Sequence, residues 1–220
     1  MTKSQYTYLH QNSPLEKQEA MTQILKAELS EIASKYKHVD SLESDPITKD
    51  TEYLIVPINQ NYAANLKKIE SLNPQNPGIK YILAFDDQAT HTPDFLSVAP
   101  CMKDIIVTGI NLRAIGSCFL GRTNITSVDF TAVPNIQTVD THFLLKTPIK
   151  SLNLAPFSKV WFIGLGCLAE CFQLKKLDLE HLHGIKIING FFLYNSPLKS
   201  TIKIPDAIQD KIKIKLFELF

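Results

Sequence analysis

The motif with the most specific chemistry in this sequence is GLGCLA, at residues 164–169, which follows the apolar residues 160–163. Its spacing, GxGxxA, is that of the fingerprint that binds a dinucleotide pyrophosphate at the start of a helix in a βαβ unit. However, Ile163-Gly164 occupies the position in an internal repeat that Ile115-Gly116 occupies two units earlier. The sequence therefore favours repeat turns over a nucleotide site, and we expect no cofactor.

Thiols and imidazoles are the other groups that could do chemistry. The four cysteines form no CxxC pair, so they are interpreted as free buried thiols, and Cys167 is assigned to the repeat position of Cys118. The histidines include no HExxH motif, and His181 and His183 lack an evident third metal ligand. A Cys–His pair formed by the fold stays open. We predict no metal site, no catalytic residues and no enzymatic activity.

Composition places the chain among ordinary folded proteins. Its 220 residues contain 23 Lys and Arg against 22 Asp and Glu, and the formal charge of +1 argues against a nucleic-acid partner. No apolar run is long enough for a signal peptide or a membrane span. We therefore expect a cytoplasmic protein with no membrane partner, although delivery into a host cell through another secretion signal stays open.

An internal repeat of about 24 residues organises most of the chain. The repeat reads FLGRTNITSVDF from Phe119 and FLLKTPIKSLNL from Phe143. It continues as LAECFQLKKLDL from Leu168 and FLYNSPLKSTIKI from Phe192, so Leu168 is aligned with the phenylalanines. Each unit supplies one short strand and one return segment, and it can bury its apolar side only by stacking on its neighbours.

The strand of each unit has a predicted centre whose side chain points into the core. These centres are Ile82, Ile105, Val128, Leu152, Leu177 and Ile202. The repeats then extend over residues 79–205, with their first two units degenerate. The segment TEYLIVPIN, near Ile55, is a further candidate strand outside the strict period.

The pattern I-G-x-x-F-L-x-x-x-x-I-x-x-V-D-F, carried by residues 115–130, resembles the BspA-like class of leucine-rich repeats. The resemblance implies an α/β leucine-rich-repeat solenoid with a parallel strand ladder. It also implies a protein-binding role, and small proteins of this kind without a signal peptide resemble bacterial effectors or effector regulators.

Both ends of the chain are expected to cap the solenoid, since open repeat arrays need covered ends. Residues 1–78 are interpreted as a helical cap, with one helix over 14–37 behind the capping box at Ser13 and a second carrying Ala63, Leu66, Ile69 and Leu72. The first helix is also a candidate partner-binding element. Residues 206–220 favour a C-terminal capping helix begun by Asp206, although KIKIKL alternates as a strand does.

The exposed face of the strand ladder is the predicted protein-binding site, because residues between the inward ones point outward. Its N-terminal end is apolar, which suits an interface core but could also be covered by the N-terminal helix. The predicted binding residues are Tyr81, Leu83, Phe85, Asp104, Ile106, Thr108, Ser127, Asp129, Asn153, Lys176, Asp178 and Glu180.

From these patterns we expect a non-catalytic module, monomeric on its own, that binds another protein and inhibits or regulates it. Two alternatives remain. One is an effector with an enzymatic segment in residues 1–78, and the other is a surface adhesin, which the missing signal peptide disfavours. The contact is expected to centre near the N-terminal strands.

Overall fold

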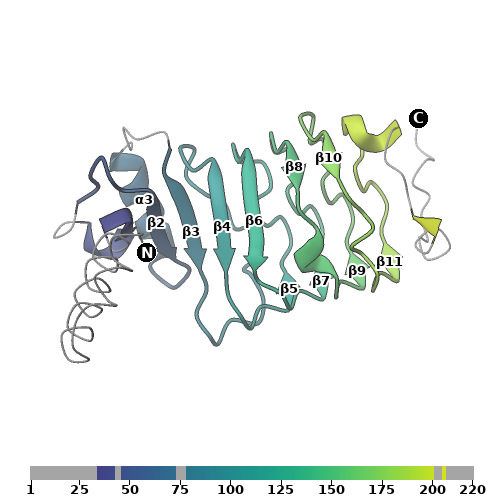
Figure 1. The fold of residues 1–220 in the computed structure, drawn as a ribbon, viewed down its shortest axis with the longest axis horizontal. Helices are drawn as coiled ribbons and strands as arrows, with labels where there is room; N and C mark the ends of the chain where they lie inside the picture. The colour runs from purple at the N-terminus through teal and green to yellow at the C-terminus, as the bar shows by residue number, and fades with distance from the viewer. Residues whose placement is uncertain (1–33, 43–45, 73–77, 201–204, 207–220) are drawn as a thin grey trace, which may run out of the picture.

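The computed structural model describes residues 34–42, 46–72, 78–200 and 205–206 of the chain. They form a parallel-strand β-solenoid of about five turns with few helices. Figure 1 shows the strands following one another from the N-terminal end to the C-terminal end of the molecule. The predicted repeat solenoid with a parallel strand ladder is therefore confirmed.

The front of the solenoid is a ladder of parallel strands. Its first five strands, in the order β1-β2-β3-β4-β6, form one hydrogen-bonded sheet, and β8 and β10 pair further along. The bounds are β1 Tyr36–His38, β2 Tyr53–Pro57, β3 Lys80–Ala84, β4 Asp104–Thr108, β6 Ser127–Ala132, β8 Ser151–Leu152 and β10 Lys176–Leu177. β2 confirms the candidate strand near Ile55, so the ladder begins well before the strict repeats.

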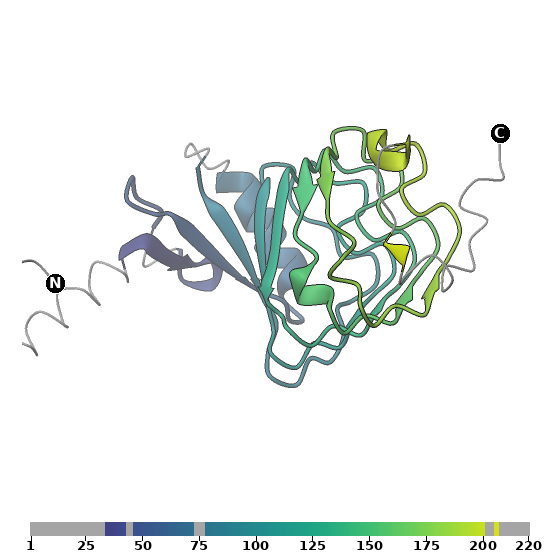
Figure 2. The same cartoon turned by 45° about the vertical axis from the view of Figure 1, so that its right-hand side comes forward.

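A second, parallel ladder forms the return side of the turns. Four two-residue strands pair in the order β11-β9-β7-β5 and follow the lower edge of Figure 1. They are β5 Ala114–Ile115, β7 Thr138–Val139, β9 Phe162–Ile163 and β11 Ile187–Ile188. The second residue of each is buried, because it points between the two ladders. Figure 2 shows the front strands and the return segments on different sides of the solenoid.

The third side of each turn is a stretch in which every second residue has a left-handed backbone, with φ between 53° and 66°. Lateral hydrogen bonds hold it: the N–H of Cys118 donates to Thr141 of the next turn (2.7 Å) and that of Leu120 to Leu96 of the previous turn (2.9 Å). These bonds offset a cost of roughly 1–2 kcal/mol per left-handed residue. The residues are Phe95, Cys118, Leu120, Arg122, His142, Leu144, Lys146, Gly166, Leu168, Glu170, Phe191, Leu193 and Asn195.

The core between the ladders is built on a cluster of phenylalanines. Phe119, Phe130, Phe143 and Phe157 are buried, with ring centroids 5.2–6.5 Å apart. Phe157 ends the 3-10 helix η2, Ala155–Phe157, which follows β8. A second such helix, η3, spans Pro197–Ser200 in the last described turn. Such aromatic packing supplies a large share of the burial that stabilises a fold this narrow.

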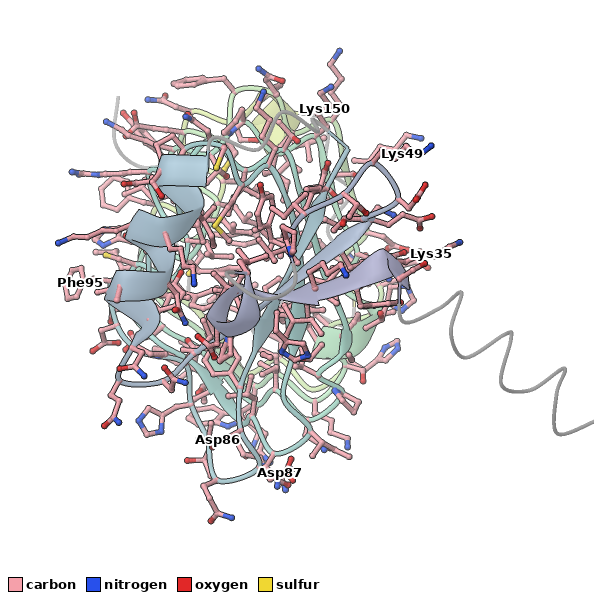
Figure 3. All side chains as sticks on the ribbon, turned by 90° about the vertical axis from the view of Figure 1, so that its left-hand side faces the viewer. Lys35, Lys49, Asp86, Asp87, Phe95 and Lys150 are labelled. Carbon is pink, nitrogen blue, oxygen red and sulfur yellow. The ribbon has the colours of Figure 1, made fainter. Side chains whose placement is uncertain are left out.

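The N-terminal region contributes both strands and a helix. α3, Tyr62–Leu72, confirms the predicted second helix, and the 3-10 helix η1, Val39–Ser41, follows β1. The Tyr62 hydroxyl donates to the Ser97 carbonyl (2.6 Å), and Figure 3 shows α3 beside Phe95. Within the predicted first helix, Ser34 and Lys35 are helical, but Tyr36 and Lys37 belong to β1. Residues 14–33, the repeat centre Ile202 and nearly all of the predicted C-terminal helix lie outside the described residues.

The predicted register of β3 is wrong by one residue. Tyr81, Leu83 and Phe85 were expected to face outward, yet they are buried, and Ile82 points outward and is half-buried. Tyr81 pairs with Ile105, and Leu54 and Val56 of β2 are buried beside them. In the segment YILAF, which follows Lys80, both alternate sets of side chains are apolar, so the period of two did not distinguish the inner set from the outer one.

The alignment of the third repeat unit is also wrong by one residue at its start, although its strand is aligned correctly, with Leu177 paired to Leu152. The N–H of Leu168 donates to Phe143, as that of Leu144 donates to Phe119, so Leu168 is the counterpart of Leu144 and Leu120. Cys167, and not Leu168, therefore takes the core position of Phe119 and Phe143. The counterpart of Cys118 is Gly166, which shares its left-handed backbone.

Candidate protein-binding surfaces

The glycines of GLGCLA shape the turn, as the repeat alignment indicated. A Cβ on Gly164 would lie 2.7 Å from the backbone of Asp140 and Thr141, and one on Gly166, with φ +66°, would lie 2.7 Å from the His142 ring. Residues 165–170 form turns, and no helix begins there to hold a pyrophosphate. The spacing of these glycines is thus explained by close contact between neighbouring turns.

The fold creates one Cys–His pair. Cys118 Sγ lies 3.9 Å from His142 Nδ1 on the next turn, and both side chains are half-buried. Within residues 78–200, no carboxylate or carbonyl is hydrogen-bonded to the His142 ring. In most catalytic pairs of this type a third group orients the base. The pair therefore lacks one part of the usual nucleophilic arrangement.

The two deeply buried thiols are held as neutral hydrogen-bond donors. Cys167 Sγ donates to the Asp140 carbonyl (3.0 Å), and burial raises the pKa of the Cys167 thiol to about 12. Cys171 Sγ donates to the Leu144 carbonyl (3.1 Å), and burial also raises its pKa. Protonated thiols are poor nucleophiles and poor metal ligands, so both residues act here as small core side chains.

His181 and His183 do not come together with further metal ligands. His181 Nε2 lies 3.7 Å from Asp178 Oδ2, and in the described part of the chain no three His, Cys, Asp or Glu residues are grouped to hold a metal ion. These histidines lie at the turn that follows β10, where His181 is half-exposed and His183 is exposed.

Nine of the twelve predicted binding residues do lie at the outer face of the front ladder or just past its strand ends. Asp104, Ile106 and Thr108 of β4 and Asp129 of β6 are half-exposed, and the remaining five are exposed. Tyr81, Leu83 and Phe85 lie in the core instead. The exposed five are Ser127, Asn153, Lys176, Asp178 and Glu180.

Three of these residues hold the local backbone. Asp129, Asn153 and Asp178 stand at equivalent positions, and each accepts a hydrogen bond from the backbone N–H two residues later, at 2.8, 3.0 and 2.9 Å. Asn153 and Asp178 directly follow β8 and β10, so their Asx turns end these strands, whereas Asp129 lies within β6. Their polar character is therefore accounted for by the fold, without a partner.

The apolar part of the outer face is a column that the sequence reasoning located only in part. Ile55, Ile82 and Ile106 are register partners on β2, β3 and β4, and all three are half-exposed. We call this column the isoleucine surface. Next to it, Tyr53 stacks on Tyr36 with ring centroids 4.6 Å apart, and Lys80 Nζ lies 5.8 Å from the Tyr53 ring. The apolar runs YLIVP and KYILA mark the two strands, but their alternation does not say which set faces outward.

A second group of exposed apolar side chains, missed entirely, lies on the return side. Trp161, Leu165 and Phe191 are 41%, 38% and 41% exposed. Trp161 packs against Phe162 of β9, which faces outward beside Ile187 of β11. The signal in the sequence was the run VWFI, in which the second and third apolar residues, Trp161 and Phe162, are not required by the core.

Among the described residues, no helix has the length and apolar character needed to cross a lipid bilayer. Searches for relatives of this chain found no matching family model, no matching curated protein and no matching solved structure.

Proposed function

We propose that this chain is a non-catalytic protein-binding module and that a folded partner docks on the isoleucine surface. The observation that carries the proposal is the alignment of Ile55, Ile82 and Ile106 on three adjacent strands of the outer face, each half-exposed. Contiguous apolar side chains beside polar ones are typical of an interface core and its rim.

The setting of these isoleucines favours recognition by side chains. β3 pairs with β2 on one side and with β4 on the other, so its backbone groups already have partners. A partner therefore meets a rigid surface of β-branched side chains, which lose little conformational freedom on binding. The stacked Tyr36 and Tyr53 and the nearby Lys80 add aromatic and cationic groups at its edge.

The repeat pattern supports a more specific biological role as part of the same proposal. The pattern resembles BspA-like leucine-rich repeats, and the chain is proposed to be a bacterial effector or effector regulator that inhibits or regulates its partner. It would act as a monomer in a cytoplasm, either that of its own cell or that of a host. This role is an argument from analogy between folds.

The test uses two pairs of charge substitutions on the same face. Proteins retained by the purified chain are identified by mass spectrometry, and the Kd of each purified candidate is measured by calorimetry. The double variant Ile82→Glu/Ile106→Glu is expected to weaken binding about tenfold or more, because it places carboxylates in the interface core. Ser127→Glu/Thr131→Glu, on the neighbouring strand β6, is the matched control and should change the Kd less than about threefold.

Urea unfolding of each variant establishes that the solenoid is intact, since all four side chains are at least half-exposed. If a purified partner binds the isoleucine variant as tightly as the unsubstituted chain, the isoleucine surface is not the docking site. Turnover of a substrate by the partner-free chain would contradict the non-catalytic assignment.

A further inference from the structure

One turn of the solenoid contains an extra residue at a corner. Thr147 and Cys171 are buried neighbours on adjacent turns, with Oγ1 and Sγ 3.5 Å apart, and Ile149 and Leu174 are buried two and three residues later. Only Pro148 lies between Thr147 and Ile149, whereas both Phe172 and Gln173 lie between Cys171 and Leu174. The additional residue places the Phe172 ring on the surface, where it is 65% exposed. The core does not require this ring, so its exposure needs another explanation.

The exposed ring forms one wall of a groove of about 650 Å³ that crosses three successive turns. Its other lining groups include the guanidinium of Arg122, the amides of Asn124 and Gln173, and the ion pair between Lys146 Nζ and Glu170 Oε2 (3.1 Å). A groove of this size holds several amino-acid side chains. It lies at the corner where the left-handed stretch leads into the front strands, away from the isoleucine surface.

Positive charge predominates around the groove. Lys146 is paired with Glu170, but no carboxylate is paired with Arg122 among the described residues. Lys150 and Lys175 are exposed two residues beyond the groove residues Pro148 and Gln173. Figure 3 shows Lys150 at the edge where the strands begin and Asp86 and Asp87 at the opposite edge. The near-neutral chain is therefore locally basic at this corner.

We propose that the groove is a second binding site, which takes an extended acidic peptide segment carrying an apolar side chain. Arg122 pairs with a carboxylate of the peptide, and its planar guanidinium can do so through two parallel hydrogen bonds. The apolar side chain packs on Phe172. The amides of Asn124 and Gln173 each both donate and accept hydrogen bonds, which suits the alternating N–H and C=O groups of a peptide backbone.

The same features argue for a peptide over a nucleic acid. A phosphate backbone offers only acceptors, and the Glu170 carboxylate in the groove would repel closely spaced phosphates. One exposed ring also supplies a single stacking position, whereas binding of single strands depends on several. The proposal does not depend on the isoleucine surface, so either surface can fail its test while the other stands.

The experiment selects peptides and then measures them. A random decapeptide library displayed on phage is selected on the full chain, and enriched peptides are synthesised with a fluorescein label for polarisation assays. The expected consensus contains acidic residues and one large apolar residue. Arg122→Glu is expected to weaken binding about tenfold or more, and the matched charge change Lys186→Glu on the return side should leave it unchanged.

Deletion of Phe172 provides the second variant, because it restores the corner spacing of the preceding turn and so preserves the fold. It is expected to weaken peptide binding about tenfold while leaving the circular dichroism spectrum and the urea midpoint close to those of the full chain. Selection of peptides without acidic residues, or binding that survives both Arg122→Glu and the deletion, would overturn the proposal. Arg122-dependent binding of a labelled oligouridylate in place of the peptides would overturn it as well.

Discussion

The ring of Phe157 packs edge-on against the ring of Phe130, with centroids 5.2 Å apart, and the two residues belong to neighbouring turns. The turn of Phe130 carries Val133 and Phe143 in two further core positions. In the next turn these positions hold Phe157 and Cys167. Phe157 is larger than Val133 at the first position, and Cys167 is smaller than Phe143 at the second. Each turn therefore contains a similar volume of core side chains.

This exchange predicts a compensating pair of substitutions. Phe157→Val should lower the free energy of unfolding by about 2–4 kcal/mol through the cavity it leaves, and Cys167→Phe by about 1–3 kcal/mol through overpacking. The double variant reproduces the preceding turn and should cost clearly less than the sum of the two. Urea unfolding of the three variants measures the coupling, and strict additivity would show that the two positions do not share volume.

Contact between turns at Gly164 predicts an unusual sensitivity to one methyl group. Gly164→Ala should destabilise the fold by about 2 kcal/mol or more, because the added Cβ would meet the Asp140 and Thr141 backbone at 2.7 Å. Gly190→Ala is the matched control, since its Cβ would lie 3.6 Å from the flexible Leu165 side chain. Thermal and urea unfolding compare the two, and equal effects would argue against the close approach.

The register of β3 predicts that truncating two adjacent side chains lowers the free energy of unfolding by different amounts. Leu83→Ala should cost about 2–5 kcal/mol, because Leu83 is fully buried. Ile82→Ala, on the outer face, should cost distinctly less, about 1 kcal/mol, because much of its side chain already meets solvent. If Ile82→Ala cost more than Leu83→Ala in urea unfolding, the register first expected from the sequence would be correct.

Burial of thiols predicts a loss of stability in alkaline solution. The pKa of Cys167 is raised from 9.0 to about 12 in the folded chain, and that of Cys171 is raised as well. Above pH 9 the unfolded thiols lose their protons while the folded ones keep them, so the unfolded state binds fewer protons and is favoured. The contribution is fully present below pH 9 and decreases as pH rises above it, towards about 12 for Cys167.

For Cys167 the slope should approach about 1.4 kcal/mol per pH unit. Burial also raises the pKa values of Tyr62 and Tyr81, which adds to the decline above pH 10. Urea unfolding at pH 8, 9 and 10 measures the slope, with Cys167→Ala as the comparison. The prediction is wrong if this variant loses stability between pH 9 and 10 as steeply as the unsubstituted chain.

Sequence reasoning recovered the period and the parallel ladder because apolar residues repeat in register over four units. It recovered helix α3 because Ala63, Leu66, Ile69 and Leu72 fall at helical spacing. It failed where that information is absent. At β3 both alternate sets of side chains after Lys80 are apolar, and near Leu168 the extra residue at Phe172 shifted the alignment by one. The left-handed residues carry mostly ordinary side chains, such as Leu120 and Lys146, because lateral hydrogen bonds hold a backbone that their types do not favour.

The candidate surfaces were predicted with similar limits. The outer face of the ladder and the apolar character of its N-terminal end were anticipated, and Ile106 belongs to both the predicted set and the isoleucine surface. Ile55 was missed because it lies outside the strict period, and Ile82 because of the register error. The corner groove depends on residues from three turns, and its charge balance is visible only once the turns are stacked.

The lateral bonds of the left-handed stretch have a consequence for how such a chain can change length. No turn can keep this backbone alone, so whole turns are the units that can be gained or lost, each lengthening or shortening the molecule by about 4.8 Å. The isoleucine surface lies on β2, β3 and β4, and the corner groove follows directly, on the stretches that lead into β6, β8 and β10. Whole turns inserted between the two would therefore increase the spacing of two bound partners without altering either contact.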